Sequence, residues 1–344
     1  MKQKNTWIVL AVLAALIFLM IYFLKMGNLA TENVTLEEKP VVQIQLTGPL
    51  AEAKAEISGL AWYGDNLVLL PQYPSVFDEN GDGVLFYIPK EELLGYLDGK
   101  IKEPLQPRTI QLIAPQLADS IPGYGGFESI GFSGPRVFLT IESGQTAVNM
   151  KGFLISGMLS PDMAAMYLDV TNLAEIAPQD QSVNHSDEAL LILGDRIATF
   201  YEINGEIYNP NPVAHVFDLD LKPIGVIPMD NLEYRLTDAA MSSDNEFWAI
   251  NYFFPGDAEL LPTSDPVEVK FGTGATHAEF DQVERIVKFQ YSESGITLAD
   301  TPPILLSLGE DIRNWEGLVL LDDRGFLMAT DKFPSTILGF VPIE

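Results

Sequence analysis

One short pattern recurs five times between residues 58 and 320, and it limits the fold more than any other feature of the sequence. Each copy has a polar or acidic residue, a small residue, alternating apolar residues, a turn and then a second apolar run. Two β-rich runs joined by turn residues are typical of a β-hairpin. The five copies begin with Ser58-Gly59-Leu60-Ala61-Trp62, Glu128-Ser129-Ile130-Gly131-Phe132, Glu188-Ala189-Leu190-Leu191-Ile192, Asp238-Ala239-Ala240-Met241-Ser242 and Glu316-Gly317-Leu318-Val319-Leu320.

The spacing of the copies predicts a β-propeller. Successive copies begin 70, 60, 50 and 78 residues apart, which leaves room for two further strands in most units. A four-stranded unit repeated around a ring is the blade of a propeller. The predicted fold class is therefore all-β, a five-bladed β-propeller over residues 40–344. A six-bladed ring is the alternative, if the 78-residue gap contains a degenerate unit.

The two ends of the propeller are expected to meet in one blade. The last copy leaves room for only three strands, whereas the apolar run at residues 41–46 (VVQIQL) precedes the first copy and belongs to no unit. As the fourth strand of the last blade, this N-terminal strand would close the ring and remove open sheet edges, which every sheet must protect. Residues 90–97 (KEELLGYL) have apolar side chains at helical spacing, which predicts a short helix inside the first blade.

The N-terminus predicts a membrane anchor. Residues 7–24 (WIVLAVLAALIFLMIYFL) are 18 residues without a charge, close to the roughly 20 that cross a bilayer core. A cleaved signal peptide is the alternative, but it has a shorter apolar region and a small-x-small cleavage site. Lys2 and Lys4 precede the span and place the N-terminus in the cytoplasm. We therefore expect one transmembrane helix within residues 1–26, a tether at 27–39, and a single-pass cell-membrane protein whose propeller lies outside the cytoplasm.

The charge of the chain restricts its partners. It contains 48 acidic and 20 basic residues, a formal net charge of −28. No nucleic acid is expected as a partner, because binding to the phosphate backbone needs a basic surface. An acidic surface also repels phosphate-rich ligands unless cations intervene. The excess of carboxylates indicates bound divalent metal, a saline habitat or solubility alone.

The repeats place two tiers of polar residues at one mouth of the central channel. In a ring of antiparallel meanders, the inner strands all begin on the same face, beside the ends of the second strands. Carboxylates this close raise each other's pKa or recruit a cation, and Ca²⁺, with its six to eight oxygen ligands, suits such a ring. The alternative is that these side chains accept backbone hydrogen bonds and tie neighbouring blades together. The predicted metal ligands are Ser58, Glu128, Glu188, Asp238 and Glu316 from the first strands and Glu142, Glu202 and Asp331 from the second, and Gln72 and Asn251 or Tyr252 complete the second tier.

A second candidate for calcium lies in a predicted loop. Residues 78–83 (DENGDG) match the first half of a calcium-binding loop. Position twelve of such a loop is a bidentate Glu, and Pro89 stands there in this chain. A hairpin turn rich in Asp, Asn and Gly is the alternative.

His185 and Glu188 are the candidate catalytic residues. His185 comes just before an inner-strand carboxylate, where it could act as a general acid at the channel mouth. His215, in the strand-like run VAHVF, fits an ordinary strand residue. Five basic residues lie near the repeat ends and could hold an anionic ligand or form exposed salt bridges: Arg136, Arg196, Arg235, Arg313 and Lys332. The chain has no G-x-S-x-G, H-E-x-x-H or phosphate-loop motif.

Three stretches of the chain resemble a known family. EISGLAWYGDNLVLL, GFESIGF and NWEGLVLLDDRGFLMATDKFPSTILGFVPI, with Asp331 in the last, are similar to the phytase-like β-propeller family, also described as having esterase-like activity of phytase. The resemblance covers most of residues 50–344 and implies a secreted or envelope propeller. NHSDEA, around His185, is more weakly similar to a motif of calcium-activated nucleotidases, which are also five-bladed.

The sequence is compatible with two functions. In the first, the acidic mouth binds Ca²⁺ and hydrolyses a phosphorylated small molecule through a metal-activated water. In the second, the propeller is a non-catalytic module that binds a partner protein or a glycan at the membrane surface. Propellers serve both purposes, so the fold alone does not choose between them.

Overall fold

The computed structural model describes residues 35–52, 55–78, 81–144, 146, 149–180 and 182–343. Within these residues, no helix is long and apolar enough to cross a membrane. The predicted anchor at 7–24 and the first part of the predicted tether, 27–34, lie outside the described residues.

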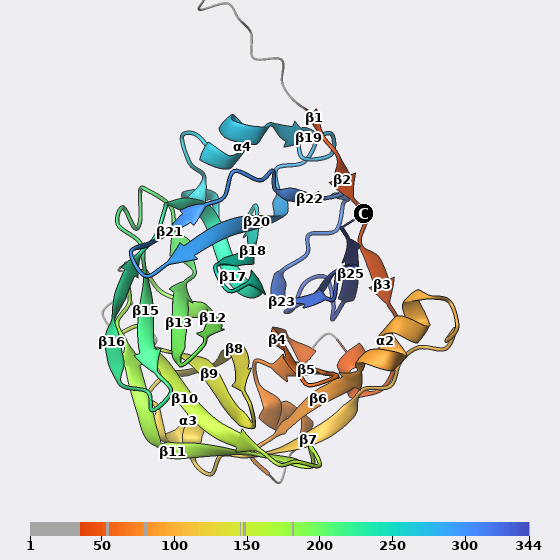
Figure 1. Cartoon of the computed structure of the whole chain (residues 1–344), viewed down its shortest axis with the longest axis vertical. Coiled ribbons are helices and arrows are strands. Elements are labelled where there is room, and N and C mark those ends of the chain that lie inside the picture. Colours follow the sequence, from red (N-terminus) through yellow and green to blue (C-terminus); the bar gives the residue numbers. More distant parts are fainter. Residues whose placement is uncertain are drawn as a thin grey trace, which may run out of the picture.

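The described strands form five antiparallel blades around a common centre, a β-propeller (Figure 1). In each blade the strands follow one another from the centre to the rim. Blade 1 consists of β4 (Ile57–Tyr63), β5 (Asn66–Pro71), β6 (Val84–Pro89) and β7 (Arg108–Ile113). Blade 2 consists of β8 (Tyr124–Ser133), β9 (Arg136–Ser143), β10 (Lys151–Leu159) and β11 (Ala165–Ile176). Blade 3 consists of β12 (Asp187–Leu193), β13 (Arg196–Tyr201), β15 (Val213–Asp218) and β16 (Pro223–Pro228).

Blade 4 is the largest and contains the 78-residue gap between the last two copies. Its strands are β17 (Leu232–Ser243), β18 (Glu246–Phe253), β20 (Val283–Ser292), β21 (Gly295–Leu298) and β22 (Ile304–Leu306). The gap holds an insertion rather than a sixth blade, as far as the described residues show. The insertion contains a 3-10 helix at Ala258–Leu260, α4 (Pro266–Phe271) and β19 (Thr273–Gly274).

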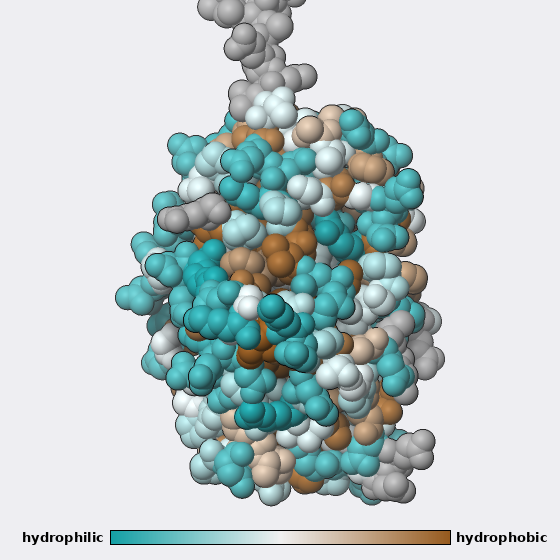
Figure 2. Space-filling model, turned by 90° about the vertical axis from the view of Figure 1, so that its right-hand side faces the viewer, coloured by the Kyte–Doolittle hydropathy of each residue, from teal (hydrophilic) through white to brown (hydrophobic). Residues whose placement is uncertain are grey.

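Blade 5 contains both ends of the propeller. It consists of β23 (Trp315–Leu321), β24 (Gly325–Thr330), β25 (Leu338–Pro342) and the N-terminal strand β3 (Val42–Ile44). β3 pairs antiparallel with β25, with Ile44 opposite Leu338. The prediction of a closing N-terminal strand is confirmed. Figure 2 shows the side that carries β3, where hydrophilic residues predominate and hydrophobic ones gather near the middle.

The remaining elements connect the blades or extend from them. The predicted helix at residues 90–97 is α2 (Lys90–Leu97), as expected. The parallel pairing of β7 with β11 joins the outer edges of blades 1 and 2. The others are α3 (Leu117–Ser120), β14 (Ile203–Asn204), which pairs with β17, and 3-10 helices at Pro49–Ala51 and Pro74–Phe77.

The hydrophobic core lies between the blades. Side chains alternate along a strand, so each blade sends every second residue to one neighbour and the rest to the other. In β9, Val137 and Leu139 pack with blade 1, whereas Phe138 packs with blade 3. Separate buried clusters occupy the junctions between blades 1 and 2, 1 and 5, 3 and 4, 4 and 5, and 2 and 3. The inner strands β4, β8, β12, β17 and β23 contact one another in turn, and β23 contacts β4 again.

The end of the predicted tether is part of the fold. β1 (Thr35–Leu36) pairs with β19, and β2 (Glu38–Lys39) pairs with β22, both in parallel. The Glu38 carboxylate accepts hydrogen bonds from the backbone N–H groups of Thr276 and His277 and lies 2.9 Å from His277 Nδ1. Residues 35–39 of the predicted tether are therefore paired with blade 4 and its insertion, which supply partners that the sequence pattern did not reveal.

We expect Glu38→Ala to destabilise the propeller by about 1–3 kcal/mol, because it leaves two backbone N–H groups and an imidazole without their acceptor. Glu37→Ala is the matched control, since Glu37 is exposed and pairs only with Lys39 among the described residues. Its effect should stay within about 0.5 kcal/mol. Urea unfolding measures both free energies. Equal losses for the two variants would show that β2 is not held by Glu38.

Candidate functional site

Every inner strand carries a β-bulge at the start of its repeat. The pairing register shifts at Ser58, Glu128, Glu188 and Glu316, and in blade 4 it shifts across both Thr237 and Asp238. A bulge leaves its residue out of the ladder and turns the side chain in a new direction. The repeat thus marks the place where each inner strand bends, and this bend decides where the polar side chain goes.

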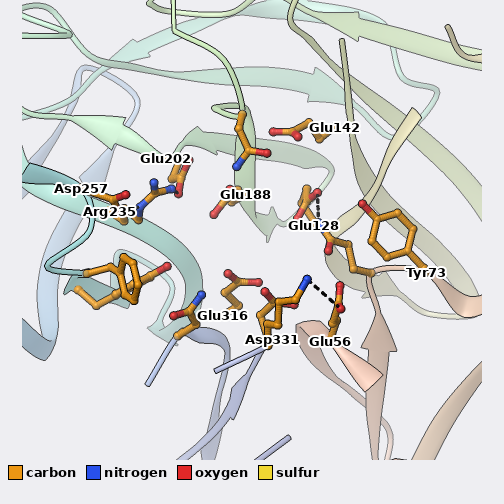
Figure 3. Close-up of a pocket in the computed structure, with 16 residues that line it drawn as sticks. Glu56, Tyr73, Glu128, Glu142, Glu188, Glu202, Arg235, Asp257, Glu316 and Asp331 are labelled. Carbon is orange, nitrogen blue, oxygen red and sulfur yellow. Dashed lines mark hydrogen bonds and ion pairs between the residues drawn. The ribbon is translucent and has the colours of Figure 1, made fainter. Parts of the chain in front are cut away.

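A pocket of about 380 Å³ opens at the channel mouth where these bulges lie (Figure 3). Its described lining is dominated by charged and polar side chains from all five blades. These are Glu56, Gln72, Tyr73, Glu128, Glu142, Asn184, Glu188, Glu202, Arg235, Tyr252, Phe254, Asp257, Asn314, Glu316, Asp331 and Lys332. Eight carboxylates and two cations therefore face the same space among the described residues.

Three of the five predicted first-tier residues reach this pocket. The carboxyl groups of Glu128, Glu188 and Glu316 point into it from blades 2, 3 and 5 (Figure 3). Glu128 accepts a hydrogen bond from Gln72 at 3.1 Å. Glu188 is buried and, like Glu316, has no hydrogen-bond or ion-pair partner among the described side chains.

The other two first-tier residues tie blades together, so the prediction that they belong to the acidic mouth is wrong. Ser58 Oγ donates to the carbonyl of Phe127 in blade 2 at 2.7 Å. Asp238 is buried, and its Oδ2 accepts from the backbone N–H of Leu318 in blade 5 at 2.6 Å. In blade 4 the register shifts between Leu236 and Ala239, and the Asp238 side chain turns toward backbone groups instead of the channel. The alternative of blade-to-blade hydrogen bonding holds for this pair.

Most residues of the predicted second tier line this pocket. Glu142, Glu202 and Asp331 all line the pocket, together with Gln72 and Tyr252. Asn251, the other option in blade 4, does not line the pocket and donates to the carbonyls of Glu233 and Arg235. Each second-tier residue follows the buried part of a second strand, and antiparallel pairing brings it beside a first-tier residue.

Burial and mutual repulsion favour protons on these carboxyl groups. Burial and the charge of Glu142 raise the pKa of Glu128 well above its ordinary value. The pKa values of Glu188 and Glu316 are also raised well above the ordinary value by burial and by neighbouring carboxylates. Burial and the charge of Glu202 raise the pKa of Glu142 to about 7. Burial and the charge of Glu56 raise the pKa of Asp331 to about 7 as well.

Arg235 is the buried cation of the pocket. Its Nε donates to Asp257 at 2.7 Å and its Nη1 donates to Glu202. Although burial opposes its charge, Glu202 raises the pKa of the Arg235 guanidinium well above its ordinary value. Glu202 Oε2 and Asp331 Oδ1 are buried and have no described hydrogen-bond partner. Both pocket cations, Arg235 and Lys332, come from the basic residues identified near the repeat ends.

His185 does not line the pocket in the described structure. Its ring is buried beside it and binds Asp180 through Nδ1 at 3.0 Å. Asp180 also accepts from the Tyr201 hydroxyl at 2.8 Å. Burial lowers the pKa of His185, but the Asp180 hydrogen bond outweighs it and leaves the pKa raised. The His185 side chain therefore lies behind the residues that line the pocket. This position does not support its predicted role as a general acid at the channel mouth.

Sequence reasoning missed several lining residues. Glu56 and Asn314 each come two residues before the first residue of a repeat, so a longer repeat would have revealed them. Asn184 precedes blade 3 and, like Glu56, adopts the left-handed backbone conformation, with φ values of 59° and 41°. Asp257 belongs to the insertion in blade 4, which has no counterpart in the other copies.

The predicted calcium loop binds protein groups with its described carboxylates. Asp78 accepts from the Gln111 side chain at 2.7 Å, and Asp82 accepts from the Ala114 backbone N–H at 2.7 Å. Residues 79–80 lie outside the described part of the chain. The hairpin-turn interpretation accounts for these contacts, and calcium binding there stays a prediction.

The oxygen donors of the pocket are of the kind that Ca²⁺ prefers. Across the described residues, however, no group of three or more His, Asp or Glu side chains is already arranged to hold a metal ion. Metal binding at this pocket therefore stays a prediction.

Comparisons with known proteins support the fold. No family model and no curated protein matches the chain. A xylan β-1,4-xylosidase from Bacillus halodurans C-125 is similar over 86% of this chain and 54% of its own, with 8% identity and a TM-score of 0.50. A GH43 endo-arabinanase from Bacillus licheniformis matches over 86% of this chain and 96% of its own, with 12% identity and a TM-score of 0.46. The soluble aldose sugar dehydrogenase from Escherichia coli matches over 88% and 99%, with 13% identity and a TM-score of 0.41.

The similarity to the xylosidase supports the fold alone, because its identity is only 8%. The chain spans about half the length of the xylosidase. Membership of the phytase-like family stays a prediction.

We expect Glu142→Gln to change stability in a pH-dependent way. The pKa of Glu142 is raised to about 7 in the folded state, against about 4.3 in an unfolded chain. Its contribution to wild-type stability is therefore fully present below about pH 4 and is lost as the pH rises through about 7. Gln resembles the neutral carboxyl, so the variant should match the wild type at pH 4 and melt at a higher temperature at pH 8.

Melting curves in calcium-free buffer across this pH range test the expectation. Glu310→Gln, in an exposed loop, is the control and should show no such trend. A pH-independent difference between the wild type and Glu142→Gln would mean that Glu142 titrates as an ordinary glutamate.

Proposed function

We propose that this protein is a hydrolase of the cell envelope, that its acidic pocket is the active site, and that it uses Ca²⁺ to act on a phosphoester. The observation that supports this most is the charge balance of the pocket, with eight carboxylates and two cations among the described lining residues. A phosphoester is repelled by such a site unless a cation offsets the field. A divalent cation offsets it and lets the carboxylates stay ionised.

Glu128, Glu188 and Glu316 would hold the ion in this proposal. They project from three different blades into one space, and Glu188 and Glu316 have no other partner among the described side chains. Ca²⁺ accepts flexible oxygen coordination, so it tolerates the rotation that these side chains need to converge. When bound, it supplies neutralisation of the pocket charge and polarisation of a phosphoryl oxygen.

The protein's own groups would orient the substrate and move protons. Arg235 is fixed by Glu202 and Asp257, so its guanidinium is positioned for an anionic oxygen at the pocket wall. Before a cation binds, burial and neighbouring carboxylates raise the pKa values of Glu142 and Asp331 to about 7, so both can exchange protons with water near neutral pH. We assign these two carboxyls to proton transfer with water and with the leaving group.

A second candidate is hydrolysis of a neutral glycoside without metal. Glu142 favours it, because its raised pKa suits the acid of the carboxyl pair that glycoside hydrolases use. The fold similarity to a xylosidase is compatible with this chemistry. If neither substrate class is hydrolysed, a non-catalytic module that binds a partner protein or glycan becomes the preferred function.

The proposal also places the propeller outside the cytoplasm, held by residues 7–24. Protease added to spheroplasts should then release a soluble fragment that begins before Thr35, because residues 35–39 are paired with blade 4. Mass spectrometry of the released fragment gives its first residue. Full protection of the propeller in intact spheroplasts, with digestion after lysis, would contradict the predicted orientation.

Calcium should stabilise the wild-type protein by about 2.7 kcal/mol at a hundredfold excess over Kd. The double variant Glu128→Gln with Glu316→Gln keeps the size of both side chains and removes two charges, so it should lose this stabilisation. Thermal melts with calcium and with chelator measure it, and a panel of phosphoesters and aryl glycosides measures activity in the same samples. Glu103→Gln with Glu310→Gln, both exposed, is the charge-matched control.

The outcomes separate the candidates. Calcium-dependent stability and phosphoester hydrolysis that disappear together in the pocket variant support the proposal. Glycoside hydrolysis that chelator does not affect would support the metal-free alternative. Identical wild-type melts with calcium and chelator would remove calcium from the site.

A further inference from the structure

We propose that Phe254 and Phe333 form a subsite for a flat aromatic ring on the molecule that the acidic pocket binds. The inference rests on the proposed function and deepens it, because it names the kind of group carried by the phosphoester. The two residues come from different blades, Phe254 directly after β18 and Phe333 between β24 and β25.

The two rings form a stacked pair at the edge of the pocket. Phe254 is one of the pocket-lining residues. Its ring lies 6.2 Å from that of Phe333, with an angle of 25° between the planes. Phe333 follows Asp331 and Lys332, which also line the pocket, and the residue is 47% exposed. An exposed aromatic surface is thus continuous with a site whose other lining is almost entirely polar.

The inner member of the pair is held in place by its surroundings. Phe254 packs against the buried cluster between blades 4 and 5. A Cβ atom at Gly256 would collide with the Phe254 ring, so the glycine leaves the space that the ring needs. Phe333 is therefore stacked on a fixed partner and presents its ring to solvent.

A single exposed apolar side chain is common on protein surfaces and needs no explanation by itself. The argument for a site is that one ring of the pair lines the pocket, so a ligand seated among the carboxylates lies next to the pair. Burial of apolar surface and offset stacking both favour a flat ring there. The carboxylates, the cations and any bound metal would then hold the polar end of the ligand, and the rings its aromatic end.

Phenylphosphonate and methylphosphonate are suitable probes, because neither is hydrolysed and they differ only in the ring. With calcium present, we expect the wild type to bind phenylphosphonate about tenfold more tightly, which corresponds to ~1.4 kcal/mol. Phe333→Ala should remove most of this preference and leave methylphosphonate binding unchanged, whereas Phe333→Tyr should keep it. Titration calorimetry measures the affinities. Val269→Ala, at an exposed position on α4, is the control and should change neither.

The subsite and the proposed function fail in different ways. Equal wild-type affinities for the two phosphonates, or a preference that survives in Phe333→Ala, would overturn the subsite. If neither phosphonate binds, the phosphoester function fails, and phenyl and methyl β-D-xylopyranoside then test the ring on neutral ligands. Equal or undetectable binding of that pair would overturn the subsite as well. Melting curves of each variant show that a lost preference does not come from unfolding.

Discussion

Each blade is buried on both faces because two other blades pack against it, and this contact between neighbours holds the remaining features in place. The core consists of clusters at the five junctions rather than a single centre. No blade can complete its own burial, so the ring is stable only when it is closed. β3 supplies this closure by adding the missing outer strand to blade 5.

The same packing explains why the pocket can be so acidic. The inner strands must bend where they converge, and the bulges there turn polar side chains away from the ladder. At Ser58 and Asp238 the released group satisfies backbone atoms of another blade and strengthens the ring. At Glu128, Glu188 and Glu316 it faces the channel, where burial raises its pKa and destabilises its charged form. The junctions between blades provide the stability that permits such a site.

The repeat made the blades, the closing strand and most of the pocket predictable, because alternation and turn residues repeat whenever a structural unit repeats. Glu142, Glu202 and Asp331 could be located for this reason, from their place at the ends of second strands. Asp238 could not, since the sequence pattern does not reveal that its carboxylate accepts from the backbone of blade 5 instead of facing the channel. Asp257 and the contacts of Glu38 depend on an insertion that occurs in one blade, so no periodicity could indicate them.

Closure by an N-terminal strand also has a consequence for how the chain is made. β3 leaves the ribosome before the inner strands of all five blades, but its partner β25 follows them, so the ring cannot close until β25 has been made. Bringing such distant segments together adds little to the equilibrium entropy loss, since each doubling of a loop costs only about 0.6 kcal/mol. It slows folding more, because non-local pairings form late. In the interval, blades 1 to 4 can assemble while blade 5 still has an open edge. A nascent chain of this kind would be most exposed to aggregation in the moments just before its last strand appears.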